Sequence, residues 1–137
     1  MEDTHTTVTA EIRRALAALE AGEAGPSPND LAEAPILNDW QAILMRSSCC
    51  LAGEVSGHPQ LHGPITTSAL IVLDPDLTWA RTMSRFYRLG SPFRFILDNG
   101  CDLSGADVHG WPVVRDEDAK ARLADLALVI RRLAASL

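Results

Sequence analysis

Apolar residues recur at helical spacing at both ends of the chain and at strand-like spacing in its middle, and this arrangement constrains the fold most. Acidic side chains from Asp116 onward suit the first turn of a C-terminal helix, where negative charge meets the helix dipole. Its apolar stripe follows spacings of four and three: Ala119, Leu123, Leu126, Ile130, Leu133 and Leu137. A shorter stripe predicts an N-terminal helix that ends at Gly22: Val8, Ile12, Ala15, Leu16 and Leu19.

The stretch between the N-terminal helix and the middle of the chain predicts a linker and two short helical segments. Residues 22–34 are rich in Gly, Pro, Ala and acidic residues, as linkers are. Within them, 30–33 has the form of a capping box for a short turn of helix. After Pro35, a second segment is expected to be helical because Ile36, Trp40, Ile43 and Leu44 share one helical face.

The middle of the chain predicts strands. Residues 51–57 alternate in polarity, and 65–73 end in the apolar run Ala69–Leu73, which is typical of a central strand buried on both faces. Residues 78–89 are rich in β-formers and favour a third strand, although Asp74, Pro75 and Gly90 would also suit a helix there. A fourth strand is expected at 93–97, and 101–112 is expected to be a loop.

These patterns predict an α+β fold: a three- or four-stranded antiparallel β-meander from about Leu51 to Leu97, flanked by N- and C-terminal helices. The length of 137 residues predicts a single domain, 1–137. Within it, 1–34 would form a helix and linker, 35–100 a helix and the meander core, and 101–137 a loop and the C-terminal helix.

Composition restricts the cellular compartment and the kinds of binding partner that we expect for this chain. A net charge of −6 disfavours non-specific binding to nucleic acid or to an anionic membrane. No apolar run approaches the ~20 residues that span a bilayer, and residues 1–5 lack the features of a signal peptide. We therefore expect a cytoplasmic protein without a membrane partner, whose three cysteines, Cys49, Cys50 and Cys101, stay reduced.

Three runs of residues resemble a known family. They are Gly53–Pro59, Ile65–Ser68 and Trp79–Gly90, with the pattern GxVxGHP…ITTS…WARTxSRxYRLG. This resembles a family of short proteobacterial proteins of unknown function, similar to proteins of phages, plasmids and integrated elements, over about residues 40–90. The resemblance implies a compact β-meander with variable helical flanks. It supplies no activity and no catalytic residues to carry over. The His62–Pro64 turn departs from the Asp-Gly-type turn of the relatives.

Residues 77–97 form a basic, aromatic segment on an otherwise acidic chain. They hold four of the arginines, five of the seven aromatic residues and no acidic residue, whereas the rest of the chain holds eight basic and eighteen acidic residues. Guanidinium groups among rings suit phosphates, bases or an acidic protein. The structural alternative is that the rings belong to the core and the arginines pair with nearby carboxylates. The candidate partner-binding residues are Trp79, Arg81, Arg85, Tyr87, Arg88 and Arg94.

The sequence contains only weak patterns for a catalytic or metal-binding site. His58 and His62 are four apart, but Pro59 keeps them off a helix, so His58 is expected to brace its turn instead. Cys101 with His109 is the best thiol–imidazole combination, and there is no C-x-x-C, nucleophile elbow or phosphate-binding loop. We expect no cofactor, no metal and no catalytic residue.

The leading functional hypothesis is a non-catalytic binding or regulatory accessory protein of a bacterial mobile element, acting on a protein partner. An inhibitor of a host defence complex belongs to this class by analogy alone. The alternatives are a nucleic-acid-binding module that uses residues 77–97, and a small hydrolase or metal-dependent enzyme. The terminal helices could also pair with those of a second copy, because Leu128 and Val129 lie off the main stripe of the last helix.

Overall fold

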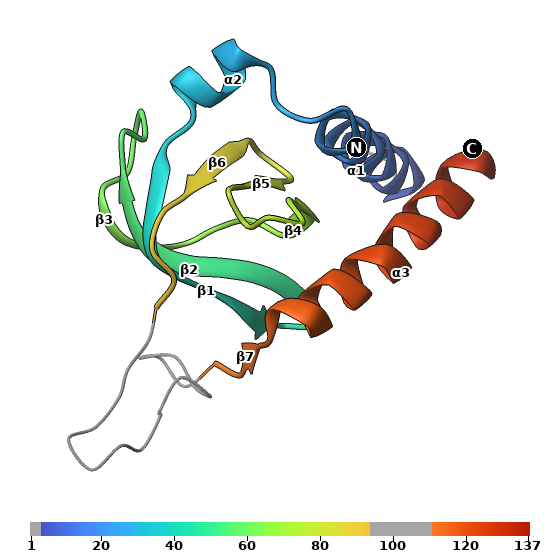
Figure 1. The fold of residues 1–137 in the computed structure, drawn as a ribbon. Coiled ribbons are helices and arrows are strands. Elements are labelled where there is room, and N and C mark those ends of the chain that lie inside the picture. Colours follow the sequence, from blue (N-terminus) through green and yellow to red (C-terminus); the bar gives the residue numbers. More distant parts are fainter. Residues whose placement is uncertain (1–3, 94–110) are drawn as a thin grey trace.

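The computed structural model describes residues 4–93 and 111–137, without the side chains of Thr4 and His5. It shows a curled sheet, with α1 and α3 together on one side and α2 apart from them (Figure 1). The elements are α1 (Thr4–Ala24), α2 (Pro28–Glu33), β1 (Ile36–Met45), β2 (Ser48–Ser56), β3 (Gly63–Thr66), β4 (Leu70–Leu73), β5 (Trp79–Thr82), β6 (Phe86–Leu89), β7 (Val113–Val114) and α3 (Asp116–Ala135).

The sheet is mixed and has more strands than the predicted meander. Six strands follow the order β3-β2-β1-β6-β5-β4, and β7 pairs with β1. The pairing of β1 with β6 is parallel, whereas the other strand pairs are antiparallel. The α+β class with terminal helices is therefore confirmed, and the wholly antiparallel three- or four-stranded meander is wrong. The predicted strand at 93–97 lies outside the described residues apart from Phe93, as does the predicted loop at 101–112 apart from its last two residues.

The segment after Pro35 is a strand, so the predicted helix there is wrong. A β-bulge shifts the register of β1 between Asn38 and Gln41, and Asp39 takes a positive φ of 50°. A bulge adds one residue to its strand, so the core-facing residues change from a spacing of two to a spacing of three. Leu37 and Trp40 are both buried for this reason, and their spacing imitates that of a helix.

The predicted strand at 65–73 is divided in two at Thr67. The backbone N–H of Thr67 donates to Leu51 O at 2.8 Å, and the N–H of Leu51 donates to Thr67 Oγ1 at 3.0 Å. Past this corner the chain leaves β2, and β4 pairs with β5. The run 69–73 is largely buried, as predicted, because α1 and α3 pack against β4. The predicted central position is wrong, since β4 lies at the end of the sheet order.

The predicted strand at 78–89 is a hairpin of β5 and β6 rather than one strand. Thr82 is fully buried, and its Oγ1 accepts hydrogen bonds from the N–H groups of Ser84 and Arg85 at 3.2 and 3.3 Å. The backbone N–H of Thr82 donates to Arg85 O at 2.9 Å. The side chain of one threonine thus closes a turn that contains no Gly, Pro or Asn.

The terminal helices match their predictions except at their caps. The first turn of α3 holds Asp116, Glu117 and Asp118, as expected. The first helix does not stop at Gly22, which is buried against Val72 of β4; it continues to Ala24, and Gly25 follows it with a φ of 82°. The capping box of α2 is formed by Ser27 and Asp30 rather than by 30–33.

Two groups of buried side chains hold the sheet and the helices together. The larger group fills the curl of the sheet with residues such as Leu37, Leu51 and Leu70, and Leu123 of α3 reaches it. The smaller group joins both terminal helices to β4 through Ala18, Leu19, Ile71 and Ile130. Both helices are thereby anchored on β4. No helix in the described part of the chain is long and apolar enough to span a membrane.

Candidate functional site

The aromatic side chains of the predicted partner-binding segment pack within the molecule. Tyr87 is only 4% exposed and lies beside the His58 ring, with 6.4 Å between ring centroids. Trp79 is half-buried and meets Phe86 edge-on at 5.8 Å. These arrangements are typical of core aromatic pairs. They give the rings a structural role, whether or not Trp79 also contacts a partner.

Two of the predicted arginines make hydrogen bonds to the backbone. Arg88 donates from Nε and Nη2 to Ala34 O, at 3.0 and 2.8 Å, and so ties the end of α2 to β6. Arg81 donates from Nε to Thr82 O at 3.0 Å, and its guanidinium carbon lies 5.1 Å from the centroid of the Phe86 ring. Arg94 lies outside the described residues.

Arg81 and Arg85 line a hollow of about 240 Å³ together with two acidic residues of α2. Asp30 and Glu33 stand on its other side, so the charges of the hollow are mixed. Burial lowers the pKa of Arg81, and the negative charge of Asp30 opposes this shift. The sequence could not reveal this mixture of charges, because α2 and the β5–β6 hairpin are about 50 residues apart.

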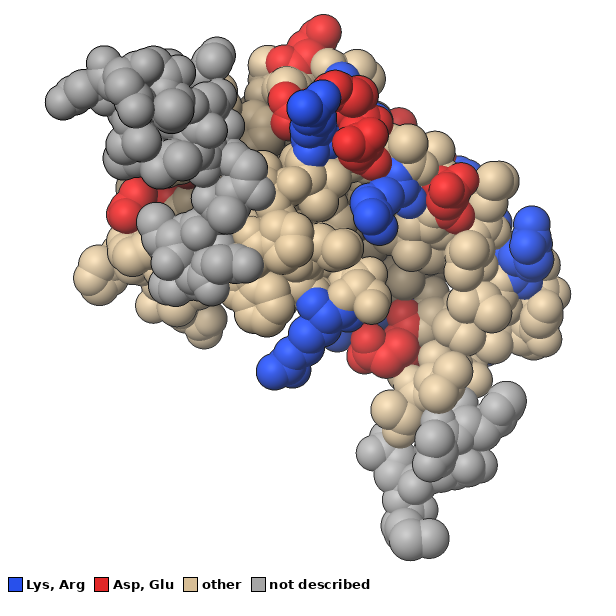
Figure 2. Space-filling view, turned by 90° about the horizontal axis from the view of Figure 1, so that it is seen from below, with Lys and Arg blue, Asp and Glu red and all other residues tan. Residues whose placement is uncertain are grey.

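The face of the molecule in Figure 2 has no basic stripe. Blue and red side chains are interspersed there, and neither sign gathers into one patch. A nucleic-acid surface normally presents basic side chains clustered on one face. The view therefore offers no support for phosphate binding on that side.

The cysteine and histidine side chains do not form a metal site within the described residues. No group of three or more His, Cys, Asp and Glu residues is placed there to hold a metal ion. His58 braces its turn as predicted, because its Nδ1 accepts from the N–H groups of Gln60 and Leu61 at 3.0 and 3.1 Å. Cys101 and His109 lie outside the described residues.

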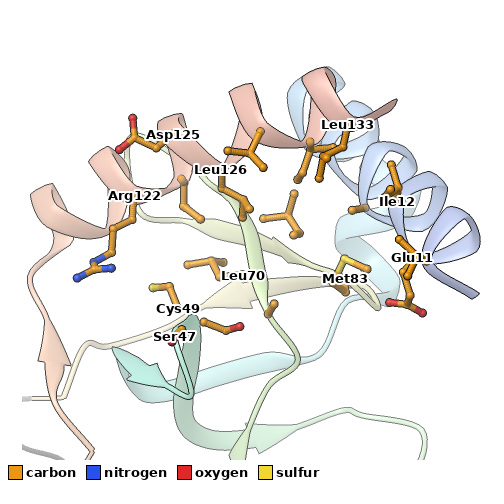
Figure 3. Close-up of a pocket in the computed structure, with 18 of the residues that line it drawn as sticks. Glu11, Ile12, Ser47, Cys49, Leu70, Met83, Arg122, Asp125, Leu126 and Leu133 are labelled. Carbon is orange, nitrogen blue, oxygen red and sulfur yellow. The ribbon is translucent and has the colours of Figure 1, made fainter. Parts of the chain in front are cut away.

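A cleft of about 670 Å³ lies between α1 and α3, and we call it the α1–α3 cleft. Its floor is formed by β4, the β1–β2 turn and Met83, and Figure 3 shows side chains from both helices above that floor. Its mouth includes large apolar side chains that are about half exposed: Val8 at 50%, Val129 at 45% and Leu133 at 47%. Its lining residues are Thr7, Val8, Glu11, Ile12, Ala15, Ser47, Ser48, Cys49, Ala69, Leu70, Ile71, Met83, Arg122, Leu123, Asp125, Leu126, Val129, Ile130 and Leu133.

The polar groups of the α1–α3 cleft lie towards its ends. Arg122 extends beside Cys49 and Ser47 at one end, and Glu11 lies at the other (Figure 3). The pKa of the Cys49 thiol is raised to about 11, mainly by burial and in part by nearby Cys50, while the positive charge of Arg122 opposes the shift. A thiol with so high a pKa is a poor nucleophile. Cys49 is therefore a poor candidate for a catalytic nucleophile in this cleft.

The sequence does not reveal this site, because its residues come from five separate segments of the chain. The helical stripes were predicted, and the off-stripe position of Val129 was the one signal that α3 has an extra apolar face. Ser47, Met83 and Arg122 carried no such signal. Each reaches the α1–α3 cleft only through the folding of the sheet against the helices.

Comparison with known proteins gives a family but no function. The model of a family of unknown function, DUF6634, matches residues 6–121. Because this match covers most of the chain, the chain belongs to that family. No curated protein and no solved structure gives a significant match. The resemblance to a family of unknown function is confirmed in this form, while its origin in proteobacteria or mobile elements stays a prediction.

Proposed function

We propose that this member of the DUF6634 family is a non-catalytic binding protein whose binding site is the α1–α3 cleft. The observation that carries the proposal is the volume of about 670 Å³ lined mainly by apolar side chains. Small-molecule sites typically occupy about 300–1,000 Å³ and are mostly apolar, with a few placed polar groups. The size and the lining of the cleft both agree with that class of site.

Exposure at the mouth explains why a guest would bind. Val8, Val129 and Leu133 keep about half of their surface in water. Burial of apolar surface contributes roughly 25 cal/mol per Å², so a guest that covers these side chains is stabilised there. Five of the six large exposed apolar residues in the described chain lie on α1 or in the C-terminal residues 128–137, and this concentration supports a contact surface there.

The lining argues for binding rather than catalysis. Among the residues that the structure describes, the lining contains no histidine, and the raised pKa of the Cys49 thiol keeps it protonated. General acid–base chemistry near neutral pH needs a group that titrates there. The accessory role with a protein partner, expected from the sequence, stays a prediction. The contacts of Arg81 and Arg88 within the chain favour the cleft over residues 77–97 as the binding site.

The test is a titration with Nile red, a neutral apolar dye whose emission reports its transfer from water. Val129→Trp fills the mouth of the α1–α3 cleft, whereas Leu128→Trp adds the same ring to an exposed neighbour that does not line it. We expect the wild type and Leu128→Trp to bind the dye equally, and Val129→Trp to bind it at least tenfold more weakly. Circular dichroism and urea unfolding establish that both variants fold.

Two results would contradict the proposal. One is a wild-type chain that does not bind Nile red. The other is a Val129→Trp variant that binds it as well as Leu128→Trp does. Charge reversal at Arg81 and Arg85 serves as a further control, because neither residue lines the cleft and dye binding should not change.

A further inference from the structure

One end of the α1–α3 cleft carries an arginine, Arg122. The guanidinium of Arg122 makes no hydrogen bond or ion pair with another residue of the described chain, although it lines the cleft. Asp125 stands one turn further along α3, and Figure 3 shows its carboxylate pointing away from the cleft. Figure 3 shows the Arg122 side chain extending beside Cys49 on the floor of the cleft. Arg122 is therefore free to bind an anion at this end.

Two hydroxyl groups lie at the same end. Ser47 and Ser48 line the cleft at the β1–β2 turn, which begins after Met45. Arg46 and Ser47 have φ values of 51° and 71°, the left-handed conformation that a tight two-residue hairpin turn requires. This turn fixes the backbone from which both serine side chains project. Hydroxyl donors beside a guanidinium make a suitable site for a carboxylate.

The rest of the cleft is apolar over a considerable length. Leu126, Val129 and Leu133 follow Arg122 along α3, and Val8 and Ile12 face them from α1. Arg122 and Leu133 are eleven residue steps apart and so lie about 16 Å apart along the helix, at about 1.5 Å of rise per residue. One cationic end and a long apolar groove match a guest with one anionic end and one unbranched tail.

We propose that the guest of the α1–α3 cleft is an unbranched aliphatic carboxylate, bound with its carboxylate at Arg122 and its chain between α1 and α3. This inference rests on the proposed function and names the ligand class for the same site. The carboxylate accepts charge-assisted hydrogen bonds from the guanidinium and from the serine hydroxyls. The alkyl chain covers the half-exposed side chains at the mouth. The tail has no charge, so it does not need a partner at the Glu11 end.

The test compares dodecanoate with dodecanol, which has the same chain and no charge, in displacement of Nile red below the concentrations at which either aggregates. Arg122→Gln removes the proposed anchor. Arg132→Gln is the matched control, since Arg132 lies on the same helix and does not line the cleft. We expect wild type and Arg132→Gln to bind dodecanoate about tenfold or more tightly than dodecanol, and Arg122→Gln to lose this preference.

The outcomes separate this inference from the proposed function. Nile red binding with no preference for dodecanoate, or an equal loss of preference in both arginine variants, would overturn the carboxylate inference and leave the apolar site standing. Failure of Nile red and dodecanoate alike would overturn both. Light scattering that shows a dimer, with Val129→Asp converting it to a dye-binding monomer, would replace the carboxylate with a second copy of this chain.

Discussion

His58 shows how one side chain can hold a turn through its neutral form. Its Nδ1 accepts two backbone hydrogen bonds, and protonation of this nitrogen would remove both. Burial lowers the pKa of His58, and the positive charge of Arg85 lowers it further. The folded chain thus binds this proton less tightly than the unfolded chain does. The stabilisation from the turn is present above about pH 6.5 and is lost as pH falls through the lowered pKa.

We predict that the His58 imidazole titrates below its ordinary pKa of 6.5 in an NMR titration of the folded protein. Asn supplies an uncharged side-chain oxygen that can accept the same bonds, so His58→Asn should show a smaller loss of stability between pH 6.5 and pH 5. Urea unfolding at both pH values measures the difference. A His58 pKa at or above 6.5 would contradict this account of the turn.

Among the elements, the terminal helices could be predicted because their signals are local. The acidic first turn and apolar stripe of α3 are read from 22 consecutive residues, 116–137, and the helix begins at Asp116 as expected. The strand β1 could not be predicted, since its bulge at Asp39 depends on the register with β2. The β5–β6 turn could not be predicted either, because it also depends on tertiary structure. It depends on the buried hydroxyl of Thr82, and threonine is otherwise a strand-forming residue.

The attachment of α2 to the sheet yields a prediction at the element scale. Arg88 Nε and Nη2 both donate to the carbonyl of buried Ala34, so Arg88→Met leaves that oxygen without these donors. We expect a loss of about 1–2 kcal/mol in the free energy of unfolding, because Arg88 is itself partly exposed. Arg85→Met is the control and should change it by less than about 0.5 kcal/mol.

Urea unfolding at neutral pH measures both arginine variants. Equal losses in Arg88→Met and Arg85→Met would show that the two arginines contribute alike and would contradict the structural role of Arg88. Binding assays on Arg88→Met would be uninformative without this comparison. A residue that holds α2 in place can affect any surface nearby.

At the scale of the whole molecule, the sequence combines a basic segment, residues 77–97, with an otherwise acidic chain. The fold brings acidic residues of that chain to the same hollow as arginines of the segment. Asp30 and Glu33 of α2 come to the same hollow as Arg81 and Arg85. The α1–α3 cleft, in contrast, is mainly apolar. It forms because α1 and α3 both pack on β4 and leave apolar side chains partly exposed between them. Neither result could be read from composition or periodicity, since both depend on which distant segments become neighbours.

The central claim is that the binding site lies between α1 and α3, and NMR chemical-shift mapping during titration with dodecanol tests it most directly. The account predicts saturable shifts at the amides of Ile12, Leu126 and Val129, with those of Arg81 and Arg85 unchanged. The neutral ligand keeps the result independent of any role for Arg122. Shifts centred on residues 79–88, or no saturable shift in α1 and α3, would contradict the claim.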